Sequence, residues 1–144
     1  MLHLPFNHTV TLIIITVIIS LLAFSNQNVM NRLIFWPPAM QRGQIDRFIT
    51  HGFIHADGTH LLFNMITLFF FGRVLEQFYR QYAFDMGFAL FYLGGLIVSI
   101  LPSYFKHKND VNYFSLGASG AVSAILYAFI LFQPWSLIFV FFIP

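Results

Sequence analysis

The first candidate for chemistry is Ser119, which lies among small residues in the stretch SLGASGAVSA at 115–124. A serine hydroxyl can act as a nucleophile when a base activates it. Small residues also let membrane helices pack closely, and a serine hydroxyl can bond a carbonyl of its own helix. The stretch alone therefore leaves two interpretations open, a nucleophile and a packing contact.

Two further polar side chains lie in an apolar segment, His60 and Asn64. Their spacing of four residues puts both on one stripe of a helix, with Asn64 about one turn deeper. Ionisable and amide groups inside a membrane are rare and indicate a functional site by default. The alternatives are a buried imidazole bonded to a carbonyl and an amide that fixes helix packing.

A metal site is a third possibility, because histidines recur at His51, His55 and His60. Zinc requires three or four ligands, and His51 and His55 could share a helical face. No HExxH motif is present, and the nearby carboxylates are only Asp46 and Asp57. We therefore expect no metal ion and no organic cofactor.

The composition places these residues in a bilayer. The chain is 58% hydrophobic and 8% charged, whereas soluble domains carry about 25% charged residues. A net charge of +2 with scattered Lys and Arg argues against nucleic acid as a partner, and zero cysteines exclude a disulfide or a thiol nucleophile. The first apolar run lacks the flanks of a cleaved signal peptide and is predicted to be a membrane helix.

Four spanning helices are expected, at 9–24, 57–79, 83–105 and 113–133, each near the roughly 20 residues that a bilayer requires. Short connections make consecutive helices antiparallel neighbours. The polar, aromatic connection at 25–59 is predicted to be a structured loop lying partly in the membrane. Glu76 and Arg80, four residues apart, are predicted to form an ion pair.

The segment 134–144 has 11 residues, which as a helix would reach about 16 Å, half of a hydrocarbon core of about 30 Å. The sequence therefore suggests a fifth helix that is cut short, in a single membrane domain at 1–144 that is incomplete at its C-terminus. A short re-entrant or interfacial tail is the alternative.

The stretch RFITHGFIHADGTHLLFNMITLFFFGRVLE at 47–76, with GASG at 117–120, resembles the rhomboid family of intramembrane serine proteases. The resemblance joins an HxxxN helix, a following FGxxxE and a GxSG helix in the right order and separation. It implies an all-α, polytopic membrane bundle with a six-helix core when complete.

The resemblance also implies roles for particular residues. Ser119 would be the nucleophile, and its own N–H with the side chains of His60 and Asn64 would bind the oxyanion. Gly117 and Gly120 would let backbone and substrate come close at the turn around Ser119. The same resemblance places His51 and His55 near a water-accessible cavity.

Two features depart from the family pattern. Asp46 and Arg47 stand where the family usually carries a Trp-Arg pair. The family draws its general base from a histidine on the sixth helix, and no residue of this chain fills that position. A serine without a base is a weak nucleophile, so we expect that this polypeptide alone does not cleave. His60 is not expected to be the base, because no third group would fix its tautomer.

The sequence therefore predicts an intramembrane serine endopeptidase that cleaves transmembrane segments of other proteins by a Ser-His dyad whose histidine lies outside this chain. It is expected to be an integral, multi-pass protein of a bacterial inner (plasma) membrane. One alternative is a non-catalytic rhomboid-like protein that binds client transmembrane helices. Another is an unrelated transporter or structural membrane protein in which GASG only packs helices.

The orientation signals disagree. Five Lys and Arg fall on the side that holds the Ser119 end, against two on the other, which by the positive-inside bias puts Ser119 toward the cytoplasm. The resemblance implies the opposite orientation, with a cytoplasmic N-terminus, and we favour it.

Overall fold

A computed structural model describes residues 7–136. This part of the chain is helical, and its only bridge between extended segments joins Phe35 to Ser115. The elements in chain order are α1 (His8–Ser25), α2 (Gln27–Leu33), α3 (Pro37–Gln41), α4 (Arg47–Thr50), a 3-10 turn (His51–Phe53), α5 (Gly58–Thr67), a π turn (Leu68–Gly72), α6 (Arg73–Tyr82), α7 (Gly87–His107) and α8 (Ser119–Phe132).

Three helices in this part of the chain are long and apolar enough to cross a membrane. They are α1, the continuous run Gly58–Tyr82 formed by α5, the π turn and α6, and α7. These confirm the first three predicted helices to within a few residues. The all-α membrane bundle predicted from the sequence is thus confirmed.

The fourth predicted helix, at 113–133, is wrong at its start. Residues 113–118 are extended or turn-like, and α8 has only 14 residues, a length of about 21 Å. Two features prevent an earlier helical start: Ser115 pairs with Phe35, and Gly117 has a φ of +108°, which a right-handed helix excludes. Residues 116–118 therefore lead into α8 through a turn rather than a helix.

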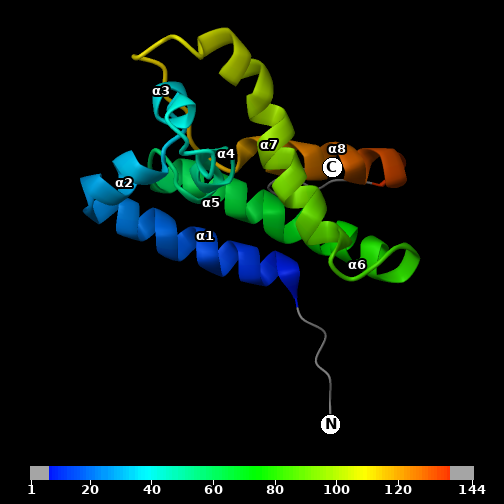
Figure 1. Cartoon of the computed structure of the whole chain (residues 1–144). Coiled ribbons are helices and arrows are strands. Elements are labelled where there is room, and N and C mark those ends of the chain that lie inside the picture. Colours follow the sequence, from blue (N-terminus) through cyan, green and yellow to red (C-terminus); the bar gives the residue numbers. More distant parts are fainter. Residues whose placement is uncertain (1–6, 137–144) are drawn as a thin grey trace.

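The core lies where α7 crosses α6 and α8, as Figure 1 shows. Fully buried side chains from three elements meet there, including Leu68, Phe88, Tyr92 and Ile125. At Gly95 an added Cβ would lie 3.1 Å from the Cα of Ala121, so α7 and α8 approach closely. Small residues at such a crossing permit the packing that joins helices in a bilayer.

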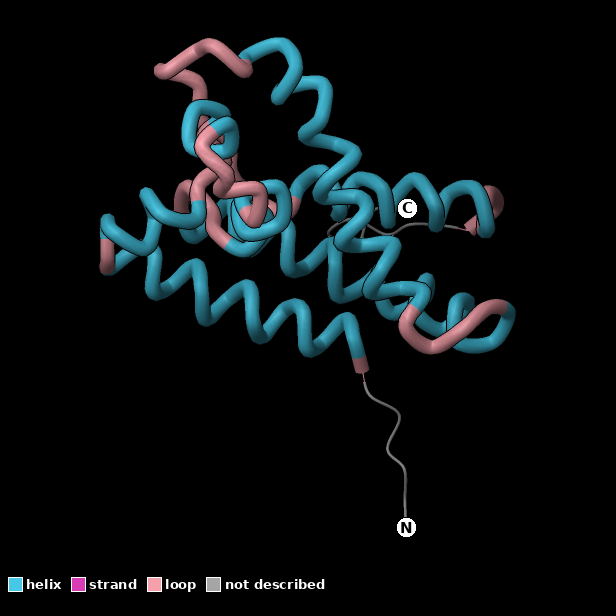
Figure 2. Tube along the Cα trace, viewed as in Figure 1, coloured by secondary structure: helices cyan, strands magenta, loops and turns pink. Residues whose placement is uncertain are grey.

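Loops gather mainly at one end of the bundle, where α2, α3 and α4 form a compact layer beside the 108–118 connection (Figure 2). Phe35 is fully buried and centres an aromatic cluster of ring contacts with Phe48, His51, Tyr104 and Tyr113. The connection at 25–59 is thus a structured loop, as predicted. The predicted fifth helix at 134–144 lies mostly outside the described residues.

Glu76 ties the opposite end together. Its carboxylate accepts hydrogen bonds from the backbone N–H groups of His8 (2.7 Å) and Thr9 (3.0 Å) and from the Thr9 hydroxyl (2.7 Å). It also pairs with Arg80 at 2.8 Å, which confirms the predicted ion pair. Glu76 thus binds the N-terminus of α1, where a negative charge is favoured and N–H groups lack partners within the helix.

Candidate functional site

Ser119 is the first residue of α8, and its side chain is exposed. Within residues 7–136, neither its hydroxyl nor its backbone N–H has a hydrogen-bond partner. The first N–H groups of a helix have no acceptor within that helix. An exposed hydroxyl and an amide donor without a partner among residues 7–136 therefore lie at one point, where the chain enters α8.

The segment before Ser119 is held by hydrogen bonds to the loop layer. Ser115 exchanges two backbone bonds with Phe35, at 2.9 and 3.1 Å. The Gly117 N–H donates to the His51 carbonyl at 2.9 Å, and the Ala118 N–H donates to His55 Nε2 at 3.3 Å. Non-helical backbone at membrane depth requires such partners within the protein. The two amides that precede Ser119 are thus occupied, which leaves the Ser119 N–H as the first free donor.

The structure brings His60 to this turn. An added Cβ at Gly117 would lie 2.7 Å from His60 Cε1, so the imidazole packs directly against the Gly117 backbone. The start of α5 fixes His60, because the Asp57 side chain accepts from the His60 N–H at 2.8 Å and caps the helix. Among the described residues, neither ring nitrogen of His60 has a hydrogen-bond partner. The ring is therefore positioned by packing, with its polar atoms unused.

Asn64 lies one turn further along α5 and is 7% exposed. Its Nδ2 donates to the His60 carbonyl at 2.9 Å, which leaves a second N–H on the same nitrogen. No hydrogen bond joins Asn64 or His60 to Ser119 in the described residues. The structure thus brings His60 to the turn before Ser119, with Asn64 one helical turn further along α5 and bonded to the His60 carbonyl.

Gly120 has a packing role. An added Cβ there would overlap the side chain of Ser99, which lies on α7 and donates to the Leu96 carbonyl at 3.1 Å. The helix-packing interpretation of the small-residue stretch therefore holds for Gly120. Gly117 is different, because its positive φ and its contact with His60 both belong to the turn before Ser119.

His51 and His55 do not face open water. They are 3% and 0% exposed, and burial lowers the pKa of both imidazoles, that of His55 to about 4 with a contribution from nearby His60. Each holds one amide of the segment before Ser119, a role that sequence reasoning missed. No local pattern around His51 or His55 predicts these contacts, because Gly117 and Ala118 are distant in the sequence.

A metal site is not assembled by the described residues, since no three His, Asp or Glu side chains converge among them. A cavity of about 440 Å³ lies at the other end of the bundle, lined by Asn7 and by residues of the π turn and α6 such as Arg73. It is remote from the Ser119 turn in the fold. The candidate site is therefore an exposed helix start rather than an enclosed pocket.

Comparison with known proteins identifies relatives of this fold. Residues 42–144 match the profile of the Rhomboid domain. The putative rhomboid protease YdcA of Bacillus subtilis (strain 168) is 36% identical over 80 residues, which cover 56% of this chain and 37% of that protein. RHOMBOID-like protein 12, mitochondrial, of Arabidopsis thaliana is 29% identical over 133 residues, covering 84% and 40%. The rhomboid protease GlpG of Enterobacter sp. (strain 638) is 30% identical over 124 residues, covering 85% and 41%. The chain thus spans less than half the length of these relatives.

Proposed function

The chain belongs to the rhomboid family, and we propose that it carries the nucleophile and the oxyanion-binding side of an intramembrane serine endopeptidase. Family membership and the apolar helices make it an integral membrane protein. The observation that carries the proposal is the turn at Ser119, where an exposed hydroxyl, a free amide and the His60 ring meet. We further propose that residues 1–144 belong to a single rhomboid-like domain.

In the proposed reaction the Ser119 hydroxyl attacks a peptide carbonyl of the substrate. The carbonyl oxygen gains negative charge as the tetrahedral intermediate forms. The backbone N–H of Ser119, a ring N–H of His60 and the second N–H of Asn64 would donate to that oxygen. Preorganised donors in a poorly solvated site supply several kcal/mol of transition-state stabilisation, typically about 3 for one donor.

The general base must take the proton from Ser119. Among the described residues, no histidine nitrogen lies within hydrogen-bond distance of the Ser119 hydroxyl. Within residues 7–136, His60 also has no carboxylate or carbonyl partner to fix its tautomer, which a base of this kind requires. We therefore propose that the base lies outside residues 7–136.

The proposed substrates are transmembrane segments of other membrane proteins. An intact helix keeps its peptide carbonyls in internal hydrogen bonds, so a segment must unwind locally before Ser119 can reach a carbonyl. The relatives include a bacterial protein and plant proteins whose names place them in mitochondria and chloroplasts. For this chain we propose a bacterial plasma membrane. No metal or organic cofactor takes part in the proposed step.

A second candidate function is a non-catalytic rhomboid-like protein that binds client helices. The specific observation in its favour is the absence of a hydrogen-bonded base at Ser119 within residues 7–136. In that case the exposed apolar faces would hold client segments without cleavage.

The test uses the protein expressed from its own gene in liposomes, with a fluorophosphonate probe and a model transmembrane substrate. Ser119→Ala is expected to abolish both labelling and cleavage. Ser123→Ala is the matched control, because Ser123 is an exposed serine four residues along the same helix and should react as the wild type does. Cleavage that survives Ser119→Ala would contradict the nucleophile assignment. A folded wild-type protein that is neither labelled nor active would favour the client-binding function.

A further inference from the structure

A buried chain of hydrogen bonds connects α1 with the start of α8. Ser20 on α1 lies 3.0 Å from His55 Nδ1 and also 3.0 Å from the Phe53 carbonyl oxygen. His55 Nε2 lies 3.3 Å from the Ala118 nitrogen. Ser20 and His55 are both fully buried, so water does not satisfy these groups. This series of hydrogen bonds ends at Ala118, one residue before Ser119.

Only one placement of protons satisfies all three hydrogen bonds of this series. The Ala118 N–H can only donate, so His55 Nε2 must carry a lone pair. The Phe53 carbonyl can only accept, so the single proton of the Ser20 hydroxyl goes to it. The Ser20 oxygen then accepts from His55 Nδ1–H. The imidazole is therefore neutral and carries its proton on Nδ1.

The other protonation states conflict with the same contacts. The opposite tautomer and the imidazolium would each set an Nε2–H against the Ala118 N–H. The imidazolium would also be a buried charge next to the His60 ring, whose centroid is 5.0 Å away. Asp57 is the nearby acidic group that favours the charged form, and burial outweighs it. The surroundings thus select one neutral tautomer.

We propose that His55 is a positioning residue for Ser119: its neutral, Nδ1-protonated imidazole, fixed by Ser20, holds the Ala118 amide and with it the turn that opens α8. The catalytic consequence rests on the proposed function, whereas the tautomer and the hydrogen bond do not. Through Ser20 and His55, α1 thereby helps to fix the position of the Ser119 turn, although no residue of α1 is proposed to touch the reacting atoms.

The consequence for the site follows from the neighbouring amide. The Ala118 N–H is the last donor before the free Ser119 N–H, and the peptide that carries it follows Gly117, whose φ is +108°. Without an acceptor at His55 Nε2 this peptide could rotate, since the residue before it is a glycine with broad backbone freedom. Rotation would move both the hydroxyl and the amide of Ser119 relative to His60.

The first measurement is the nitrogen NMR spectrum of the histidine rings of the wild-type protein in lipid bicelles at neutral pH. The His55 ring is expected to show a protonated Nδ1 and an unprotonated Nε2. A ring protonated on Nε2, or on both nitrogens, would overturn the proposal. This measurement needs no variant and no proteolytic activity.

The second measurement is hydrogen exchange of the Ala118 amide in two His55 variants, with the ring spectrum repeated in two serine variants. His55→Leu removes the acceptor and is expected to speed exchange about tenfold. His55→Gln places a carbonyl oxygen near the position of Nε2 and is expected to restore protection. Ser20→Ala should shift the ring toward a mixture of tautomers, whereas Ser25→Ala should leave it unchanged, because Ser25 is exposed and bonds only carbonyls of its own helix. Unchanged exchange in a folded His55→Leu protein would overturn the proposal.

The third measurement concerns Ser119 itself. The rate of fluorophosphonate labelling is expected to fall at least about tenfold in His55→Leu and to recover in His55→Gln. Equal labelling of folded wild-type and His55→Leu proteins would contradict a positioning role. A wild-type protein that does not label counts against the proposed function, and the ring spectrum and Ala118 exchange then decide the role of His55.

Discussion

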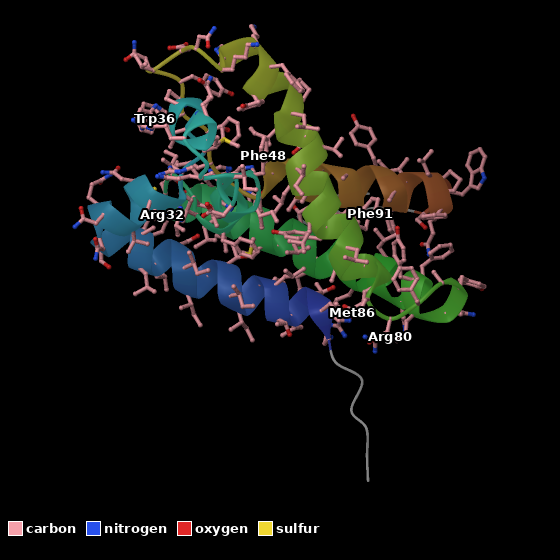
Figure 3. All side chains as sticks on the ribbon, viewed as in Figure 1. Arg32, Trp36, Phe48, Arg80, Met86 and Phe91 are labelled. Carbon is pink, nitrogen blue, oxygen red and sulfur yellow. The ribbon has the colours of Figure 1, made fainter. Side chains whose placement is uncertain are left out.

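The two ends of the bundle treat their polar groups in opposite ways. Figure 3 shows Arg32 and Trp36 at the loop end, which carries the Ser119 turn, and Arg80 and Met86 at the other. At the far end the Glu76 carboxylate is buried and accepts from the start of α1 and from Arg80. At the Ser119 turn the hydrogen bonds join neutral groups, and donors on Ser119 and His60 have no acceptor among residues 7–136. Polar groups with complete sets of partners anchor the fold, while unused donors mark the place where a ligand can bind.

The largest expected effect follows from removing the Glu76 carboxylate, which anchors the start of α1 and pairs with Arg80. Glu76→Leu removes the acceptor of two backbone N–H groups and a hydroxyl, and one carboxylate partner of Arg80, and should lower the free energy of unfolding by about 3 kcal/mol or more. Unfolding in mixed detergent micelles measures this change.

The control for the anchor is Asp85→Asn. Asp85 also contacts Arg80, at 3.3 Å, but its side chain is 56% exposed, so the effect should be small. Equal losses in the two variants would contradict the distinction between a buried anchor and surface charge.

The next effect is a dependence of stability on pH at the Ser119 end. The pKa of His55 is about 4 in the folded protein, below the ordinary value of 6.5. The unfolded chain therefore binds a proton first, so stability is complete above pH 6.5 and falls as the pH drops from 6.5 to about 4, by up to about 3 kcal/mol.

The variant His55→Gln isolates this titration, since glutamine does not ionise. Its stability should change less between pH 6.5 and 4 than that of the wild type. His51 is also buried with a lowered pKa, so His51→Gln is measured separately. A pH profile unchanged by His55→Gln would show that His55 is not neutral and buried as described.

Gly117→Ala should have an intermediate effect on stability and a strong one on Ser119. The residue would adopt a φ of +108° and its Cβ would press on the His60 ring, at a cost of about 1–3 kcal/mol. Gly43→Ala is the matched control, because Gly43 has a φ of +97° with no atom near the added Cβ. Labelling of Ser119 should fall only in Gly117→Ala. Equal labelling of both variants would contradict the placement of His60 in the site.

The smallest expected effect is at an exposed ion pair of the loop end. Arg32 and Asp46 lie 2.8 Å apart with side chains 53% and 44% exposed. The hydrogen bond from Arg32 lowers the pKa of Asp46, so the pair's contribution is present near neutral pH and is lost in acid. Arg32→Ala should lower stability by less than about 1 kcal/mol, measured by the same unfolding. A loss as large as that of Glu76→Leu would show that surface charge also anchors this end.

The sequence predicted most of the helices because apolar runs of spanning length are a strong signal. It also identified Ser119, His60 and Asn64 as candidates, and the structure packs His60 against Gly117, two residues before Ser119. It did not predict the extended segment at 113–118, whose apolar composition suits a helix equally well. The pairing of Ser115 with Phe35 joins residues 80 positions apart and has no local pattern.

The same limit applies to the partners of single side chains. Four-residue spacing predicted the bond between Glu76 and Arg80, because both lie on one helix. The contacts of Glu76 with α1 and of His55 with Ala118 depend on how distant helices pack. Spacing within the sequence carries no information about that packing.

The π turn at Leu68–Gly72 has a consequence for the angular phase of its helix. Asn64 and Glu76 are 12 residues apart, which in an ideal α-helix would set their side chains about 120° apart around the axis. The π turn, with bonds from residue i to i+5, holds one extra residue. The residues after it are therefore rotated by up to about 100° relative to an ideal α-helix, which brings the two side chains close to the same face. Both polar side chains therefore turn toward the protein interior. One continuous helix can then bury Asn64 near one of its ends and present Glu76 to the start of α1 without exposing either to lipid.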